Sequence, residues 1–124
     1  MRITIKILIL VFGMFCINTL QAQNSSELWE KANAFYATEE YDKAISAYEQ
    51  ILEEGQVSAK LYFNLGNAYY KAGDINKAIL NYERAKLLAP QDEDIQFNLN
   101  LANQYVVTKS MSCQNPFLYD GKTG

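Results

Sequence analysis

The sequence predicts an all-α fold in which two helix-turn-helix repeats are followed by a closing helix. Two segments, residues 25–58 and 59–92, align without a gap at a period of 34. Small and large residues fall in the same register in both segments: Ala32 with Gly66, Ala44 with Ala78, Phe35 with Tyr69, and Tyr48 with Tyr82. Small residues let paired helices approach, and large ones fill the space around the contact. An unrelated amphipathic bundle is the alternative, but it would not repeat both kinds of residue in register.

The first 22 residues have the order of a secretory signal peptide. Basic Arg2 and Lys6 precede an apolar run over residues 7–17, and a more polar stretch follows, with cleavage expected after Ala22. The sequence therefore predicts an exported protein, in the periplasm or at the periplasmic face of the membrane. Its helical-repeat domain is predicted over residues 23–109.

The leader could also be an uncleaved membrane anchor or a lipoprotein signal. An apolar run counted from Ile3 keeps an uncleaved anchor, and therefore membrane association, open. Leu20 also stands where a small residue is usual before a cleavage site. A lipoprotein signal is disfavoured, because bulky Phe15 precedes Cys16 where such signals require a small residue.

The second repeat has the clearer internal boundaries. Gly73 and Asp74 suit the end of one helix and the N-cap of the next, and Pro90 ends the second helix. In the first repeat the sequence Glu39-Glu40-Tyr41-Asp42 occupies the turn and is a weaker helix breaker. With "LYFNLGNAYYKAGD" followed by "INKAILNYERA", this pattern resembles the tetratricopeptide repeat (TPR) family.

The third segment, residues 93–109, is predicted to be a single closing helix. Acidic residues at 92–94 suit a helix start because of the helix dipole. Asn100, Asn103 and Gln104 suit the polar outer face that a terminal helix needs. Residues 110–124 have no period and are predicted to be a loose tail.

Composition disfavours enzymes, metal sites and nucleic-acid binding. The chain has no histidine, the commonest general base and metal ligand. Cys16 and Cys113 are too isolated for a disulfide framework or a zinc motif. Without Arg2 and Lys6 of the leader, nine basic residues face 14 acidic ones, a net charge of −5 that opposes phosphate binding. We therefore expect no catalytic role, no cofactor and no metal.

The TPR resemblance implies that the first helix of each repeat lines a concave face that binds a protein or peptide. The second, fifth, ninth and twelfth places of each repeat point into that face. Aromatic side chains and asparagine amides there suit a peptide or a partner helix. The alternative, strongest for the aromatic residue of the closing helix, is that the aromatics fill helix–helix contacts. The predicted partner-binding residues are Trp29, Asn33, Tyr36, Lys60, Phe63, Asn64, Asn67, Tyr70 and Phe97.

One TPR ligand class is disfavoured by the same positions. TPR domains that grip a C-terminal carboxylate use asparagines with nearby basic side chains, and Asn33 and Asn64 stand at matching places. The basic residues do not match: Trp29 replaces a lysine, and Asp94 and Asn98 replace a basic pair. We therefore do not expect capture of acidic C-terminal tails.

A closer resemblance runs from the leader through residues 61–103 to "VVTK" at 106–109. These segments resemble the TPR protein of bacterial Bat (aerotolerance) operons. The resemblance implies an envelope role in stress tolerance, through assembly with Bat proteins that carry von Willebrand factor A-like domains. Members of that family continue into a membrane span and an SH3-like domain that this sequence lacks.

Two classes of function follow. The first is an interaction module or assembly scaffold in the bacterial envelope. The second is a structural protein that self-associates through the end faces of its repeats, or a truncated fragment without function.

Overall fold

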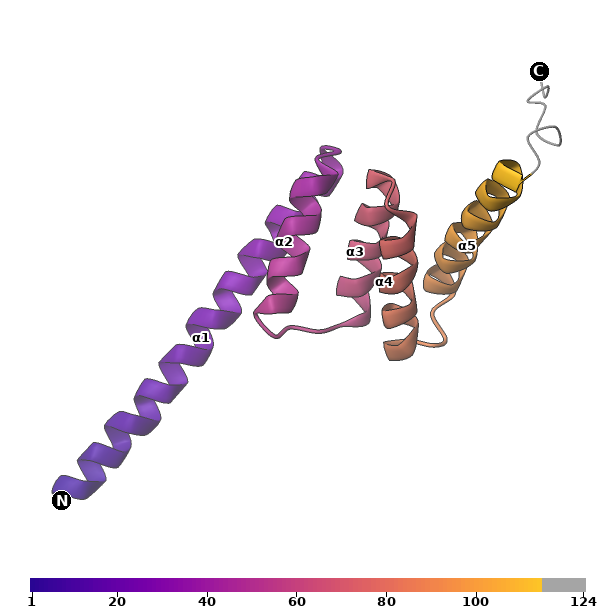
Figure 1. Ribbon diagram of the computed structural model, residues 1–124. Coiled ribbons are helices and arrows are strands. Elements are labelled where there is room, and N and C mark those ends of the chain that lie inside the picture. Colours follow the sequence, from indigo (N-terminus) through magenta and orange to yellow (C-terminus); the bar gives the residue numbers. More distant parts are fainter. Residues whose placement is uncertain (115–124) are drawn as a thin grey trace.

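The computed structural model describes the backbone of residues 1–114 and the side chains of residues 1–14 and 24–114. Within these residues it contains helices only, which confirms the all-α helix-turn-helix array. The helices are α1 (Arg2–Ala37), α2 (Tyr41–Glu53), α3 (Ala59–Ala72), α4 (Ile75–Leu88) and α5 (Glu93–Gln114). Consecutive helices pack side by side and alternate in direction, so the array grows from α1 to α5 (Figure 1).

Small residues stand where the paired helices cross, as the period predicts. Ala32 and Ala44 are fully buried between α1 and α2, and Ala78 is fully buried where α3 meets α4. A Cβ atom on Gly66 would lie 2.7 Å from the ring of Tyr82, so this ring packs directly against the backbone of α3. The close helix contact and the large side chain that fills it therefore depend on each other.

The turns within the two repeats, α1–α2 and α3–α4, share a residue with positive φ, but the residue type differs. Gly73 ends α3 in the left-handed conformation, at φ 90°, and Asp74 caps α4 by accepting a hydrogen bond from the Lys77 amide. In the first repeat Glu39 takes the place of that glycine at φ 62°, and Glu40 makes no side-chain cap. The first turn is therefore the weaker one, as its sequence indicates.

The closing helix is longer than the sequence analysis predicted. We expected it to end at residue 109, but α5 continues to Gln114, so residues 110–114 belong to the helix and not to a loose tail. No proline or glycine occurs between Glu93 and Pro116, and the hydroxyls of Thr108 and Ser112 donate to carbonyls of their own helix. The rest of the predicted tail lies outside the described residues.

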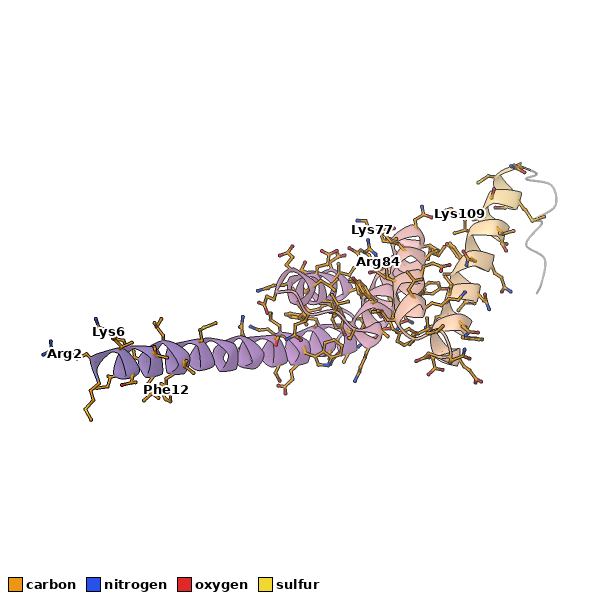
Figure 2. The ribbon with its side chains drawn as sticks, turned by 90° about the horizontal axis from the view of Figure 1, so that it is seen from below. Arg2, Lys6, Phe12, Lys77, Arg84 and Lys109 are labelled. Carbon is orange, nitrogen blue, oxygen red and sulfur yellow. The ribbon has the colours of Figure 1, made fainter. Side chains whose placement is uncertain are left out.

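The leader and the first repeat helix form one continuous helix. The apolar side chains from Ile3 to Met14 are 54–74% exposed, and this part of α1 projects away from the other helices (Figure 2). Asn24 and Ser25 of α1 are hydrogen-bonded to Glu54 and Gln56 at the end of the first repeat. None of the helices in the described residues combines the length and apolar character needed to cross a membrane.

A tyrosine–carboxylate hydrogen bond links the two repeats and makes stability depend on pH. The Tyr69 hydroxyl donates to Glu49, and burial together with this carboxylate raises the pKa of Tyr69 to about 12. Because the folded pKa exceeds the unfolded value near 10, the contribution to stability is complete below pH 10 and is lost as the pH rises from 10 to 12. An absorbance titration of tyrosine, combined with unfolding curves over this range, measures both effects.

The matched variant for this prediction is Glu49→Gln. It removes the charge that opposes ionisation, so the pKa of Tyr69 should fall and the alkaline loss of stability should begin at lower pH. An unchanged tyrosine titration in Glu49→Gln would show that the carboxylate does not act on Tyr69.

Candidate functional site

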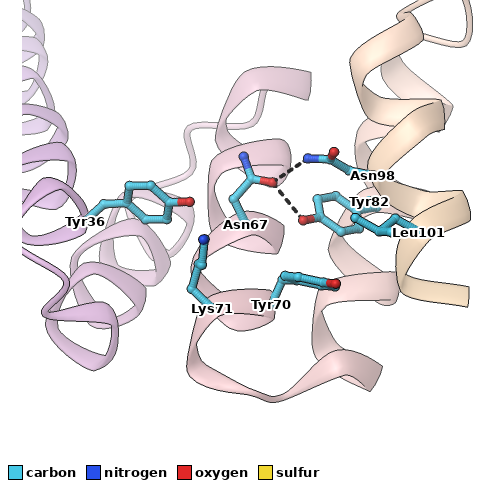
Figure 3. A pocket seen from close by; sticks show the side chains of 7 residues that line it. All are labelled: Tyr36, Asn67, Tyr70, Lys71, Tyr82, Asn98 and Leu101. Atoms are coloured by element: carbon cyan, nitrogen blue, oxygen red, sulfur yellow. Dashed lines mark hydrogen bonds between the residues drawn. The ribbon is translucent and has the colours of Figure 1, made fainter. Parts of the chain in front are cut away.

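Two adjoining cavities open between the first helices of successive repeats. The smaller has a volume of about 80 Å³ and the larger, which Figure 3 shows, of about 250 Å³; they share Tyr36 and Asn67. Together we call them the groove. Its lining residues are Asn33, Tyr36, Tyr48, Asn64, Asn67, Tyr70, Lys71, Tyr82, Asn98 and Leu101.

A hydrogen bond between asparagine and tyrosine is repeated along the groove. The Tyr48 hydroxyl donates to Asn33 Oδ1 at 2.7 Å, and the Tyr82 hydroxyl donates to Asn67 Oδ1 at 2.7 Å. Asn98 Nδ2 adds a second bond to Asn67 Oδ1, at 2.9 Å (Figure 3). Each tyrosine comes from the second helix of a repeat and each of these asparagines from the first, so the bonds tie the groove wall to the core.

These bonds fix which side of each amide is offered to a ligand. The carbonyl oxygens of Asn33 and Asn67 are occupied, while neither Nδ2 group donates to any residue in the described part of the chain. Burial raises the pKa of Tyr48 and Tyr82 above the usual value of 10, so both hydroxyls remain protonated donors at physiological pH. The groove therefore presents amide N–H donors in fixed orientations, which suit carbonyl or carboxylate oxygens.

The structure brings five of the nine predicted residues into the groove. Asn33, Tyr36 and Asn64 line the smaller cavity, and Tyr36 and Tyr70 line the larger, with Asn67 in both. The first helices of the two repeats supply all five, at the ninth and twelfth places and, for Asn64, at the sixth.

The other predicted residues lie elsewhere. Trp29 is half-buried, packs edge-on against Tyr48 at 5.8 Å and lies under the Lys60 ammonium at 5.6 Å; both line a separate cavity beside the α2–α3 connection. Phe63 is half-buried and packs against Tyr82 at 6.0 Å. Phe97 is 67% exposed, so this side chain does not fill a helix–helix contact.

Sequence reasoning missed Tyr48, Lys71 and Tyr82 as groove residues, and it placed Asn98 and Leu101 on the concave face without including them in the predicted binding set. The two tyrosines were assigned to the core by their period, and their rings are indeed buried, but their hydroxyls reach the groove. The constant spacing of 15 residues between asparagine and tyrosine in both repeats is the signal that could have found them.

A family model described as a tetratricopeptide repeat matches residues 30–93, slightly more than half of the 124-residue chain. No curated protein matches the chain.

Proposed function

Because the chain belongs to the tetratricopeptide repeat family, whose all-helical arrays typically bind proteins and are not enzymes, we propose that it is an interaction module or assembly scaffold whose partner binds in the groove. The repeated asparagine–tyrosine bond carries this proposal. It holds N–H donors one repeat apart without using their hydrogen-bonding capacity. An extended segment of a partner has carbonyl oxygens along its length to match such donors.

Exposed apolar residues extend the groove along α5. Leu101 is 41% exposed and lines the groove, and Phe97 lies one helical turn before it on the same face of α5. Large apolar side chains beside oriented polar groups are the usual composition of a binding site. A partner that covers Phe97 and Leu101 would bury area that the free protein leaves in water.

A pull-down with matched variants tests this proposal. Phe97→Ser/Leu101→Ser changes exposed residues beside the groove, and Leu80→Ser/Leu87→Ser changes two residues of α4 that are 48% and 83% exposed. All four positions are exposed enough that folding should be retained, which circular dichroism checks. We expect wild type and the α4 variant to recover the same envelope protein, and the groove variant to lose it.

Two results would contradict the groove as the binding surface. One is equal recovery of the partner by the Phe97→Ser/Leu101→Ser variant. The other is loss of the partner only in the α4 variant, which would move the interface to the opposite helix layer.

Self-association by end-to-end stacking has less support. Leu61, Leu65 and Ala68 of α3 are buried against the preceding repeat, but the equivalent residues of α1 are Glu27, Lys31 and Ala34, all exposed. At the other end α5 presents the exposed residues Asn100 and Asn103. Exposed Val107 and Met111 follow on the same face of α5, so only the charged α1 end matches a closed array better than a stacking surface.

We place the protein in the envelope, after export and removal of residues 1–22. The exposed apolar side chains at 3–14 support a leader separate from the domain. Expression of the full chain in a bacterium and mass spectrometry of the exported product should find an N-terminus at Gln23. A product that keeps residues 1–22 would support the uncleaved anchor instead.

The partners we propose are other envelope proteins of the Bat type, in an assembly linked to aerotolerance. The resemblance of the leader, the repeats and the segment up to Lys109 to the Bat TPR protein supports this proposal. Identification of the protein lost by the Phe97→Ser/Leu101→Ser variant is the direct test. A partner without a von Willebrand factor A-like domain would contradict the Bat assignment and leave the interaction module intact.

A further inference from the structure

The end of the groove near the α3–α4 turn is positively charged, whereas the chain as a whole is acidic. Lys71 is the charged residue among those that line the groove. A third cavity, of about 450 Å³, adjoins the groove through Tyr70 and Leu101, and its charged lining residue is Lys109. No described aspartate or glutamate lines any of the three, although acidic residues outnumber basic ones in the whole chain.

Both lysines are free to bind a ligand. The ion pairs among the described residues join Lys43 to Glu40 and Lys77 to Asp74, so neither Lys71 nor Lys109 has an acidic partner there. Both side chains are exposed, and the Lys71 ammonium points into the groove between α1 and α3 (Figure 3). An ammonium without a carboxylate partner at the wall of a cavity attracts an anion.

Neutral donors surround the same end of the groove. Tyr36 and Tyr70 line the larger cavity with Lys71, and the Nδ2 of Asn67 is turned away from the bonds that hold its Oδ1. Burial and the neighbouring Tyr41 raise the pKa of Tyr36, so its hydroxyl stays protonated. Lysines, tyrosine hydroxyls and an amide N–H together form a donor-rich surface for carboxylate oxygens.

We propose that this end of the groove binds an internal acidic segment of the partner, with aspartate or glutamate side chains held at Lys71 and Lys109. The inference rests on the proposed function and names the chemistry of the partner. Two acidic residues could oppose such a ligand. Asp94 lies 15 residues before Lys109 on α5, about 22 Å along the helix. Asp74 lines a neighbouring cavity with Lys109, but its carboxylate is paired with Lys77 at 3.7 Å. The exposed Leu101 and Tyr105 supply apolar contact beside the lysines.

Selection from a display library of random linear peptides tests the proposal with the full chain immobilised. Three proteins are compared: wild type, Lys71→Gln/Lys109→Gln, and a control, Lys31→Gln/Lys86→Gln, that loses the same charge from exposed positions that do not line these cavities. We expect wild type and control to enrich peptides rich in aspartate or glutamate. The affinity of a selected peptide should fall about 10-fold in Lys71→Gln/Lys109→Gln and weaken with salt.

The outcomes separate this inference from the proposed function. Enriched peptides that are neutral or basic and lose binding in Phe97→Ser/Leu101→Ser would overturn the acidic segment and leave the groove as the binding surface. Acidic peptides that bind equally to both lysine variants would also overturn it, because long-range charge alone would then explain the selection. If no peptide depends on Phe97 and Leu101, both the groove and this inference fail.

Discussion

Tyr82→Ala is expected to lower the free energy of unfolding by about 3–5 kcal/mol. The ring is 2% exposed and packs against the backbone of α3 at Gly66, so its removal leaves a cavity between α3 and α4. A domain of this size has about 5–15 kcal/mol of stability in total, so the loss is a large fraction of it and the variant should unfold at a much lower urea concentration. Urea unfolding followed by circular dichroism measures the change.

Tyr82→Phe is the control that separates packing from hydrogen bonding. It keeps the ring and removes only the hydroxyl, and Asn67 Oδ1 still accepts from Asn98 at 2.9 Å. The expected cost is about 0.5–1.5 kcal/mol. If the alanine and phenylalanine variants unfold at the same urea concentration, packing of the ring against Gly66 is not what holds α3 and α4 together.

Asn67→Ala is expected to reduce both stability and partner binding. The variant leaves the Tyr82 hydroxyl, which is part of a buried side chain, without its acceptor, at a cost of about 1–3 kcal/mol. It also removes the N–H donors that the groove offers, which should weaken the partner about 10-fold. Unfolding curves and a binding titration with the partner from the pull-down measure the two effects separately.

The double variant Asn67→Ala/Tyr82→Phe distinguishes the two roles of Asn67. Stability should recover relative to Asn67→Ala, because the stranded hydroxyl is gone, whereas the affinity should remain low because the donors are still missing. Recovery of affinity together with stability would mean that Asn67 serves only the fold and that the partner does not contact it.

Much of the fold could be predicted because a helical-repeat protein places the same kinds of residue at equivalent positions of each repeat. The small residues at Ala44 and Ala78 and the break at Gly73 gave the repeats and their boundaries. The length of α5 could not be predicted by period, because residues 110–114 belong to neither repeat and most of their side chains are exposed. Glu39 adopts a positive φ that glycine usually supplies and that costs energy for other residues, so the packing of the helices determines its backbone conformation.

The groove was predictable in its outline but not in its chemistry. Repeat places correctly brought Asn33 and Asn67 to one surface, since helix geometry alone decides which face a place occupies. The burial of Trp29 and Phe63 depends on how closely the rings of Tyr48 and Tyr82 pack against them. A repeat pattern in the sequence does not give these distances. The lysine-lined end arises from two helices that are distant in sequence and was found only in the structure.

Site-specific photo-crosslinking in the cell tests the central claim most directly. A photoreactive phenylalanine analogue replaces Phe97 beside the groove in one chain and Leu87, which is 83% exposed on α4, in another. We expect a heterologous envelope protein to crosslink from position 97 and not from position 87. Crosslinking of that protein from position 87 alone, or of a second copy of this chain from position 97, would contradict partner binding in the groove.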